Sequence, residues 1–323
     1  MKKRLPILGK DGFSLIEVMI ALLIVAFSMT AIFASFNFQQ KSYLAQNAVA
    51  EMQQNVRGAV QFFEMDARNA GFGIPSHVLY KLPALLVGGT GSIVMVSGLG
   101  VLDGGASGTD NVYTIYLSAT ATELAASMPQ PSSELKVVDA GGWQAGDIAI
   151  IFDDTTADVF QVTAVQASNH LQHNPQGLFS GSFSKAYGEG STVAKISYAG
   201  YYIDTSDPAH PTLTRNILDN TGNFVPQIVA DDIEDFQVRL VLENGSEYDP
   251  DYFLTAPGDA QRGNVREMRV YIMGRTRTAE KDWNEGPIPK WNRTSVASLA
   301  PYNKHRRRSM EMVIDLRNSG IAP

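Results

Sequence analysis

The stretch that decides the fold is Gly12-Phe13-Ser14-Leu15-Ile16-Glu17, together with the apolar run that follows it. Residues 18–36 include no charged side chain, and a helix of that length spans roughly 28 Å, close to the hydrocarbon thickness of a bilayer. The run predicts a transmembrane helix over about residues 14–36. Glu17 is the acid at its start, and a carboxylate at the membrane centre costs about 2.5–3.5 kcal/mol. Glu17 therefore needs a partner or a functional reason.

A basic leader precedes the apolar run. Its charged residues are Lys2, Lys3, Arg4, Lys10 and Asp11. Positive charge on this side predicts a cytoplasmic N-terminus and a periplasmic body. A secretory signal peptide is the competing interpretation, but such a signal has an apolar core of about 7–15 residues and a small-residue cleavage site close by. The run here is longer, and the Ala-x-Ala sequence at 48–50 lies well downstream of it.

Beyond this run an apolar face continues at helical spacing. Apolar residues recur in steps of three and four at Leu44, Ala48, Met52, Val56, Val60, Phe63, Ala67 and Ala70. Polar and charged residues fill the other positions, which is typical of an amphipathic helix. No proline occurs between Phe13 and Gly71, so the pattern predicts one helix over residues 13–72. Gly71, Gly73 and Pro75 are expected to end it.

From Ser76 onward the pattern changes to alternating apolar and polar residues, separated by Gly, Asp, Asn and Pro. Strands are predicted at 93–97, 111–117, 135–139, 147–152, 158–165, 193–204, 212–217, 233–242, 265–274 and 310–316. Residues 168–190 are predicted as a long loop, and residues 276–308 as an extended surface excursion. The sequence therefore predicts a β-rich head after the helix.

The composition and the missing motifs argue against several classes of function. The chain has 323 residues, 44% of them apolar, with no cysteine and a net charge of −7. The acidic balance argues against a general nucleic-acid binder, and the lack of cysteine excludes disulfides, thiol nucleophiles and thiolate metal sites. The sequence also has no Gly-x-Ser-x-Gly elbow and no Walker loop, so we expect no enzymatic activity and no cofactor.

Candidate metal ligands occur in three places. His170 and His173 have the i, i+3 spacing that two helical ligands use, but they lie in a predicted loop without a neighbouring acid. Two acidic clusters, at 153–158 and 231–235, offer oxygen atoms to calcium but do not match the EF-hand pattern. We interpret both clusters as turn acids beside strands and expect no metal site.

The densest basic run is Lys304-His305-Arg306-Arg307-Arg308. We interpret it as a solvated loop before the last strand. The alternative is a contact with phosphates or with an acidic partner. The acidic charge of the head favours a neighbouring subunit over nucleic acid as that partner.

The N-terminal motif resembles the class III signal of type IV prepilins and pseudopilins. That family has a short basic leader, a glycine at the cleavage site, a phenylalanine after it and a glutamate five residues into the mature chain, all present here. The resemblance implies that prepilin peptidase cleaves between Gly12 and Phe13 and that the Phe13 amine is then methylated. Glu17 lies one helical turn after Phe13, so in a filament it can meet the freed amine of a neighbouring subunit and offset the burial of both charges.

Further segments resemble minor pilins of the PilW type. They are residues 63–72 at the helix end, 108–110, 146–151 and 159–163 in the head, and 315–318 at the close. The resemblance implies an α+β fold, with the long helix packed on an antiparallel pilin-type β-sheet that includes the strands at 193–204 and 265–274 and the last strand. It also implies a leader at 1–12, the helix at 13–72 and a periplasmic head at 73–323 with a β-rich insertion at about 79–191.

The expected function is that of a minor pilin in type IV pilus assembly, held in the bacterial inner membrane by a single span. The expected partners are other minor pilins, the major pilin, prepilin peptidase, the inner-membrane assembly platform and membrane lipid, but no nucleic acid. Two alternatives stay open. One is a type II secretion pseudopilin of the GspJ type, whose heads are usually shorter. The other is a single-pass anchored periplasmic binding protein or enzyme that keeps its leader.

Overall fold

The computed structural model describes residues 12–75, 94–96, 98–104, 108–166, 169–175, 181–219, 224–250, 252, 263–284 and 302–316. The chain divides into two compact units, residues 1–50 and 51–323. Helix α1 belongs to both and runs from Leu15 to Asn69 over 55 residues. The long N-terminal helix is therefore confirmed.

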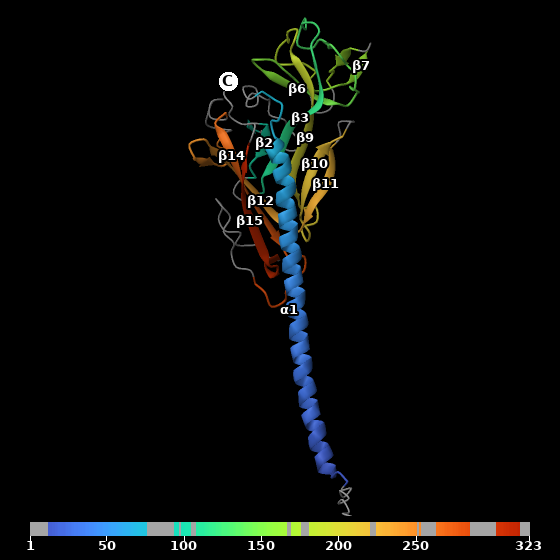
Figure 1. The fold of residues 1–323 in the computed structure, drawn as a ribbon, viewed down its shortest axis with the longest axis vertical. Coiled ribbons are helices and arrows are strands. Elements are labelled where there is room, and N and C mark those ends of the chain that lie inside the picture. The colour runs from blue at the N-terminus through green and yellow to red at the C-terminus, as the bar shows by residue number, and fades with distance from the viewer. Residues whose placement is uncertain are drawn as a thin grey trace, which may run out of the picture. The chain divides into compact units, whose positions relative to one another are not determined.

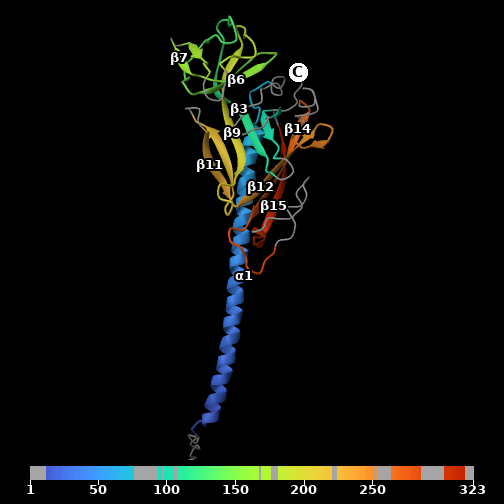
Figure 2. The same cartoon turned by 180° about the vertical axis from the view of Figure 1, so that it is seen from behind.

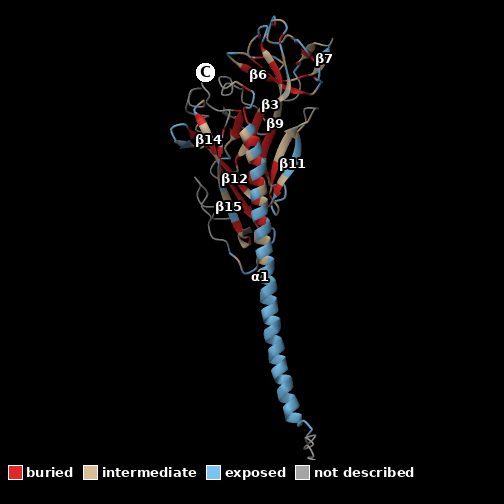
Figure 3. Ribbon diagram, viewed as in Figure 1, coloured by how far each residue is buried: buried red, intermediate tan, exposed pale blue. Residues whose placement is uncertain are grey.

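The described part of the first unit is mainly the N-terminal part of α1, whose apolar side chains are exposed all round. Leu15 is 81% exposed and Phe27 is 71% exposed, and the same stretch is pale blue in Figure 3. By length and composition this helix is apolar enough to cross a membrane. Such a surface requires lipid or other apolar helices as its surroundings, because water solvates it poorly.

The described part of the second unit contains three antiparallel sheets (Figures 1 and 2). The eight-stranded sheet has the order β1 (Val94–Val96), β2 (Leu99–Leu102), β3 (Asn111–Glu123), β9 (Thr192–Asp204), β10 (Thr212–Leu218) and β11 (Phe224–Asp231), with β5 (Ile148–Phe152) paired to β9 and to β6 (Ala157–Gln161). The four-stranded sheet has the order β13 (Glu247–Tyr248), β12 (Ile233–Leu242), β14 (Val265–Arg275) and β15 (Arg307–Asp315). The smallest sheet has the order β4 (Leu135–Lys136), β8 (His170–Gln172) and β7 (Ala164–Gln166).

The α+β class with antiparallel sheets is confirmed, but the strands are divided differently from the prediction. The expectation that 193–204 and 265–274 share one sheet is wrong, because β9 and β14 lie in different sheets. The division occurs at Asp232, whose φ of 57° is left-handed and turns the chain between β11 and β12. Strands β2, β8, β11 and β13 were not predicted, and β8 lies within the expected loop at 168–190.

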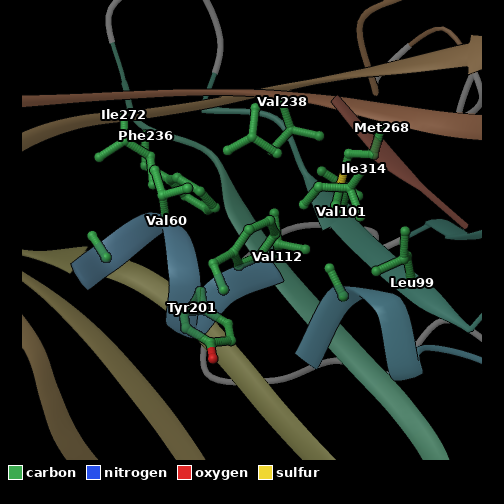
Figure 4. Close-up of a cluster of buried hydrophobic side chains, with 14 of the residues drawn as sticks. Val60, Leu99, Val101, Val112, Tyr201, Phe236, Val238, Met268, Ile272 and Ile314 are labelled. Atoms are coloured by element: carbon green, nitrogen blue, oxygen red, sulfur yellow. The ribbon is translucent and has the colours of Figure 1, made fainter. Parts of the chain in front are cut away.

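One face of α1 forms the centre of the main core, between the two larger sheets. Phe63 is fully buried, and its ring meets Tyr201 of β9 and Phe236 of β12 edge-on, each at a centroid distance of 5.0 Å. Figure 4 shows Val60 of the helix among side chains from both sheets. A fully buried side chain of this size contributes about 1.5–3 kcal/mol, so the helix face holds the two sheets together.

A buried carboxylate also ties α1 to the eight-stranded sheet. Asp66 accepts hydrogen bonds from Tyr201 Oη at 2.5 Å and from Arg215 Nε at 2.6 Å. Burial, together with the negative charge of Asp66, raises the pKa of Tyr201 well above its ordinary value, so this hydroxyl stays a donor. Removing one partner of such a buried pair costs about 3–5 kcal/mol. The contact therefore selects one register of the helix on the sheet.

The helix ends against β3. The Gly71 N–H donates to Ile115 O at 2.7 Å, and the Leu117 N–H donates to Phe72 O at 2.9 Å. Gly98 has φ of 79°, and a Cβ on it would lie 2.2 Å from Gly71 N, so this close approach requires glycine. Gly71, which is predicted to end the helix, thus also joins the chain to the sheet through its backbone N–H.

A second group of buried side chains lies in the segment predicted as an insertion. It includes Phe160, Leu171 and Tyr187 and is separate from the main core. In contrast, Leu99 and Val112 pack in the main core with α1, although both fall within residues 79–191. The insertion and its boundaries stay a prediction.

A substitution at Gly274 can test how closely the helix packs on the four-stranded sheet. A Cβ at Gly274 would lie 2.6 Å from Val56 Cγ2 of α1. We expect Gly274→Ala to lower the free energy of unfolding by about 1–3 kcal/mol, as overpacking does. Gly58, on the same helix, has nothing within 4 Å of a Cβ. The control Gly58→Ala should therefore raise stability by about 0.5–1 kcal/mol. Denaturant titration of the full chain in detergent measures both, and an unchanged or more stable Gly274→Ala would contradict the close packing.

Candidate processing and assembly site

The two residues of the predicted cleavage site lie before the helix. Gly12 and Phe13 have no helical structure, and Phe13 is 87% exposed. Residues 1–11, which include the basic leader, lie outside the described part of the chain. The bond between Gly12 and Phe13 is thus in a non-helical, exposed stretch.

Ser14 and Glu17 cap the start of α1 reciprocally. The backbone N–H of Ser14 donates to Glu17 Oε2 at 2.9 Å, and the backbone N–H of Glu17 donates to Ser14 Oγ at 3.3 Å. This arrangement is a capping box, which satisfies two donors that a helix start otherwise leaves open. Ser14 was not among the residues predicted to have a role, although its Ser-x-x-Glu spacing is the sequence signal for such a box.

The capping box gives the Glu17 carboxylate a partner within its own chain. Glu17 also lies in the first turn of α1, where the helix dipole favours negative charge. Within the described residues, Oε1 of this carboxylate makes no hydrogen bond, whereas Oε2 accepts one. A carboxylate can accept several bonds, so Glu17 can bind an incoming cation while it still caps the helix.

The two histidines that were considered as metal ligands have separate protein partners. His170 Nδ1 lies 2.9 Å from Glu134 Oε1, and His173 Nε2 lies 2.7 Å from Ser133 O. The buried His173 ring stacks on Phe183 with centroids 4.1 Å apart. Among the described residues no group of three or more potential ligands could hold a metal ion.

The first acidic cluster is bound by neighbouring side chains. Lys185 Nζ donates to Asp153 Oδ2 at 2.5 Å, and Thr155 Oγ1 donates to Asp153 Oδ1 at 2.8 Å. Burial alone would raise the pKa of Asp153, but the hydrogen bonds from Lys185 and Thr155 outweigh it and lower that pKa to about 2. Asp158 accepts instead from Tyr187 Oη at 2.7 Å. Asp153 thus organises the turn between β5 and β6, whereas Asp158 lies in β6 and binds a segment distant in the sequence.

The second acidic cluster meets the basic run in the interior. Arg275 Nη1 donates to Glu234 Oε1 at 2.7 Å, and Arg307 Nε donates to Glu234 Oε2 at 2.5 Å. The side chains of Arg275 and Arg307 are only 1% and 2% exposed. The interpretation of 304–308 as a solvated loop is therefore wrong for Arg307. This residue begins β15 and is buried with two hydrogen bonds to Glu234 of β12, which it shares with Arg275.

The neighbours of Arg307 are also engaged within the chain. Arg306 binds Glu280 through two bonds, Nε to Oε1 at 2.7 Å and Nη2 to Oε2 at 2.9 Å, and lies over the Trp283 ring. His305 is buried, with Nδ1 2.5 Å from Thr276 O. His305, Arg306 and Arg307 thus hold the segment after β14 against β15, whereas Arg308 is exposed.

Comparison with known proteins agrees with the N-terminal motif. A family model for the prokaryotic N-terminal methylation motif matches residues 9–33, and the model for type IV pilus-assembly protein W matches residues 200–318. No curated protein matches the chain. Among solved structures, a type IV-like pilin from Thermus thermophilus is similar, with 10% identity over 83% of this chain and 97% of the other, at a TM-score of 0.36.

His173 makes the stability of the head depend on pH. Burial lowers its pKa below the ordinary value of 6.5, so below about pH 6.5 the unfolded chain binds the proton more readily than the folded chain. We expect the free energy of unfolding to fall as the pH drops from about 7.5 to 5, and to fall less in His173→Gln. The control is the half-buried His170, and His170→Gln should retain the pH dependence that His173 contributes. Denaturant titrations across this pH range measure the free energy of unfolding. An identical pH dependence in wild type and His173→Gln would contradict the contribution of His173.

Proposed function

We propose that this chain acts as a minor pilin in type IV pilus assembly, because its sequence matches the models of the N-terminal methylation motif and of type IV pilus-assembly protein W. The observation that carries the proposal is the occurrence of both matches in one chain, at residues 9–33 and 200–318. Its large head makes it a poor repeating unit and a better component of the initiating or tip complex.

The first proposed step is processing at the leader. Prepilin peptidase would hydrolyse the bond between Gly12 and Phe13 on the cytoplasmic side. The non-helical, exposed backbone at these residues supports this step, because a peptidase needs an accessible bond outside regular structure. Cleavage frees the Phe13 amine, whose ordinary pKa of about 8 keeps it cationic near neutral pH. Methylation of this amine would retain the charge, as it does for lysine.

The second proposed step is pairing between subunits. Glu17 of one subunit would bind the Phe13 amine of its neighbour, with Oε1 as the acceptor while Oε2 continues to cap the helix. An unpaired charge is costly in hydrocarbon, so the pairing offsets the burial of both groups. Because each subunit carries both groups at a fixed place, the pair sets the register between neighbours.

The proposed location follows from the span and the leader. Residues 18–36 would anchor the chain in the inner membrane, with a cytoplasmic N-terminus set by the basic leader and the head in the periplasm. A pilin-family chain interacts with other pilus components. The proposed ones are other minor pilins, the major pilin and the inner-membrane assembly platform. The proposed role is structural rather than enzymatic.

The processing step predicts the mass of the native protein. We expect the chain from its native membrane to begin at N-methylated Phe13, as measured by intact mass and N-terminal sequencing. Gly12→Val should retain Met1 and lose function, whereas the control Gly58→Ala should be processed normally. A wild-type chain that keeps residues 1–12 would refute processing and leave a plain membrane-anchored periplasmic domain.

The pairing step predicts that Glu17→Ala is cleaved but assembles poorly, because the neighbour's amine then lacks its counter-charge. Each variant is returned to a deletion strain, and surface pili and type II secretion are both measured. Glu51→Ala removes an exposed acid from the same helix and should restore pili fully. Normal piliation by Glu17→Ala would contradict the register role, and loss of secretion rather than of pili in the deletion strain would point to a pseudopilin.

A further inference from the structure

A cavity of about 370 Å³ in the second unit has no role in the proposed assembly. Side chains from β3, β9 and β10 and from the turn before β5 line it, among them Tyr116, Ser118, Gln144, Lys195, Ser197 and Arg215. Tyr116 and Ser197 are direct partners in the β3–β9 ladder and therefore lie on the same face of the sheet. The site thus joins the main sheet to the segment that precedes β5, a kind of junction where ligand sites often occur.

The cations of the cavity are already neutralised. Lys195 Nζ lies 2.6 Å from Asp147 Oδ2, and Arg215 Nε lies 2.6 Å from Asp66 Oδ2. Both acids are almost fully buried, with side chains 5% and 3% exposed. Asp219 adds another carboxylate to the lining. The cavity therefore has no excess positive charge to attract a phosphate or another anion.

Three hydroxyl groups and one amide of the lining are available to hydrogen-bond a ligand. Within the described part of the chain, the side-chain hydroxyls of Tyr116, Ser118 and Ser197 make no hydrogen bond, and neither does the side-chain amide of Gln144. A hydroxyl both donates and accepts, and an amide offers both functions at one end. This set matches a ligand that is itself rich in hydroxyls.

The backbone around the cavity offers little to a bound peptide. Strand β9 pairs with β3 along one edge, and along its other edge it pairs with β5 up to Lys195 and with β10 from Ala199, so residues 196–198 have a strand partner on one side only. A bound peptide commonly pairs with a free strand edge, and here that edge is limited to three residues. Ile148 and Ile217 add apolar surface to the lining, suited to the C–H face of a ring.

We infer that this cavity binds a neutral saccharide of one or two rings. Its volume is at the lower end of small-molecule sites, which run from about 300 to 1,000 Å³. The hydroxyls and the amide would hydrogen-bond the sugar, and the two isoleucines would contact its apolar face. The same chemistry is offered by the amino-sugar backbone of a bacterial cell wall and by uncharged glycans on another cell surface.

The test is calorimetric titration of the full chain in a detergent that contains no sugar. The probes are N-acetylglucosamine and its β-1,4-linked dimer for the cell-wall source, galactose and lactose for the surface-glycan source, and inorganic phosphate as the anion. We expect at least one sugar to bind and phosphate not to bind. Raising sodium chloride from about 50 to 500 mM should leave the affinity unchanged, because salt screens only charged ligands. Binding of phosphate alone, or of none of the probes, would overturn the inference.

Two variants locate the binding. Ser197→Leu fills the cavity and should abolish sugar binding, whereas the exposed control Ser206→Leu should bind as wild type does. Tyr116→Phe removes one hydroxyl with little change of shape and should weaken binding roughly three- to tenfold, the value of one hydrogen bond. Thermal unfolding checks that each variant is folded, and if Ser197→Leu is not, Tyr116→Phe decides. Wild-type affinity in a folded Ser197→Leu or in Tyr116→Phe would refute the site.

Discussion

The head depends on the burial of one face of α1 between two sheets. Phe63 contacts an aromatic ring from each sheet, and Asp66 binds Tyr201 and Arg215 on one of them. The apolar contacts supply most of the stabilisation, because they are extensive. The buried carboxylate of Asp66 selects the register of the helix on the sheet. Gly274 completes the arrangement, since only a residue without Cβ lets the other sheet approach Val56 so closely.

The apolar side chains of the first unit are not buried within the chain as those of the head are. They have no cover within the described chain, so lipid and neighbouring helices must provide their surroundings. The polar groups at the start of this unit are arranged for the same environment. Ser14 and Glu17 satisfy each other, which lowers the cost of an acid beside the membrane and still leaves one carboxylate oxygen for an amine. One residue can thus serve the helix and the proposed assembly contact.

Most of the buried charged residues of the head form ion pairs and hydrogen bonds with other residues of the head. Arg275 and Arg307 share Glu234, and Arg275 also donates to the carbonyls of Pro208 and Ala209. Buried guanidinium groups persist here because most of their donors meet acceptors at hydrogen-bonding distance. A basic run in an acidic chain is therefore poor evidence of a binding surface until its partners are known. The cations of the cavity beside Arg215 are likewise paired within the chain, so neutral hydroxyls are left as the proposed recognition groups.

The sequence by itself determined the membrane-compatible helix, its end near Gly71 and the β-rich head, because periodicity, length and turn residues are local properties of the chain. The prepilin motif around Phe13 was equally local. Only the tertiary structure decided that the strands form separate sheets and that Arg307 is buried. It also created the cavity at Ser197. These features depend on pairing between distant residues, as Glu234 and Arg307 are 73 positions apart, and no short pattern encodes which of many possible partners will meet.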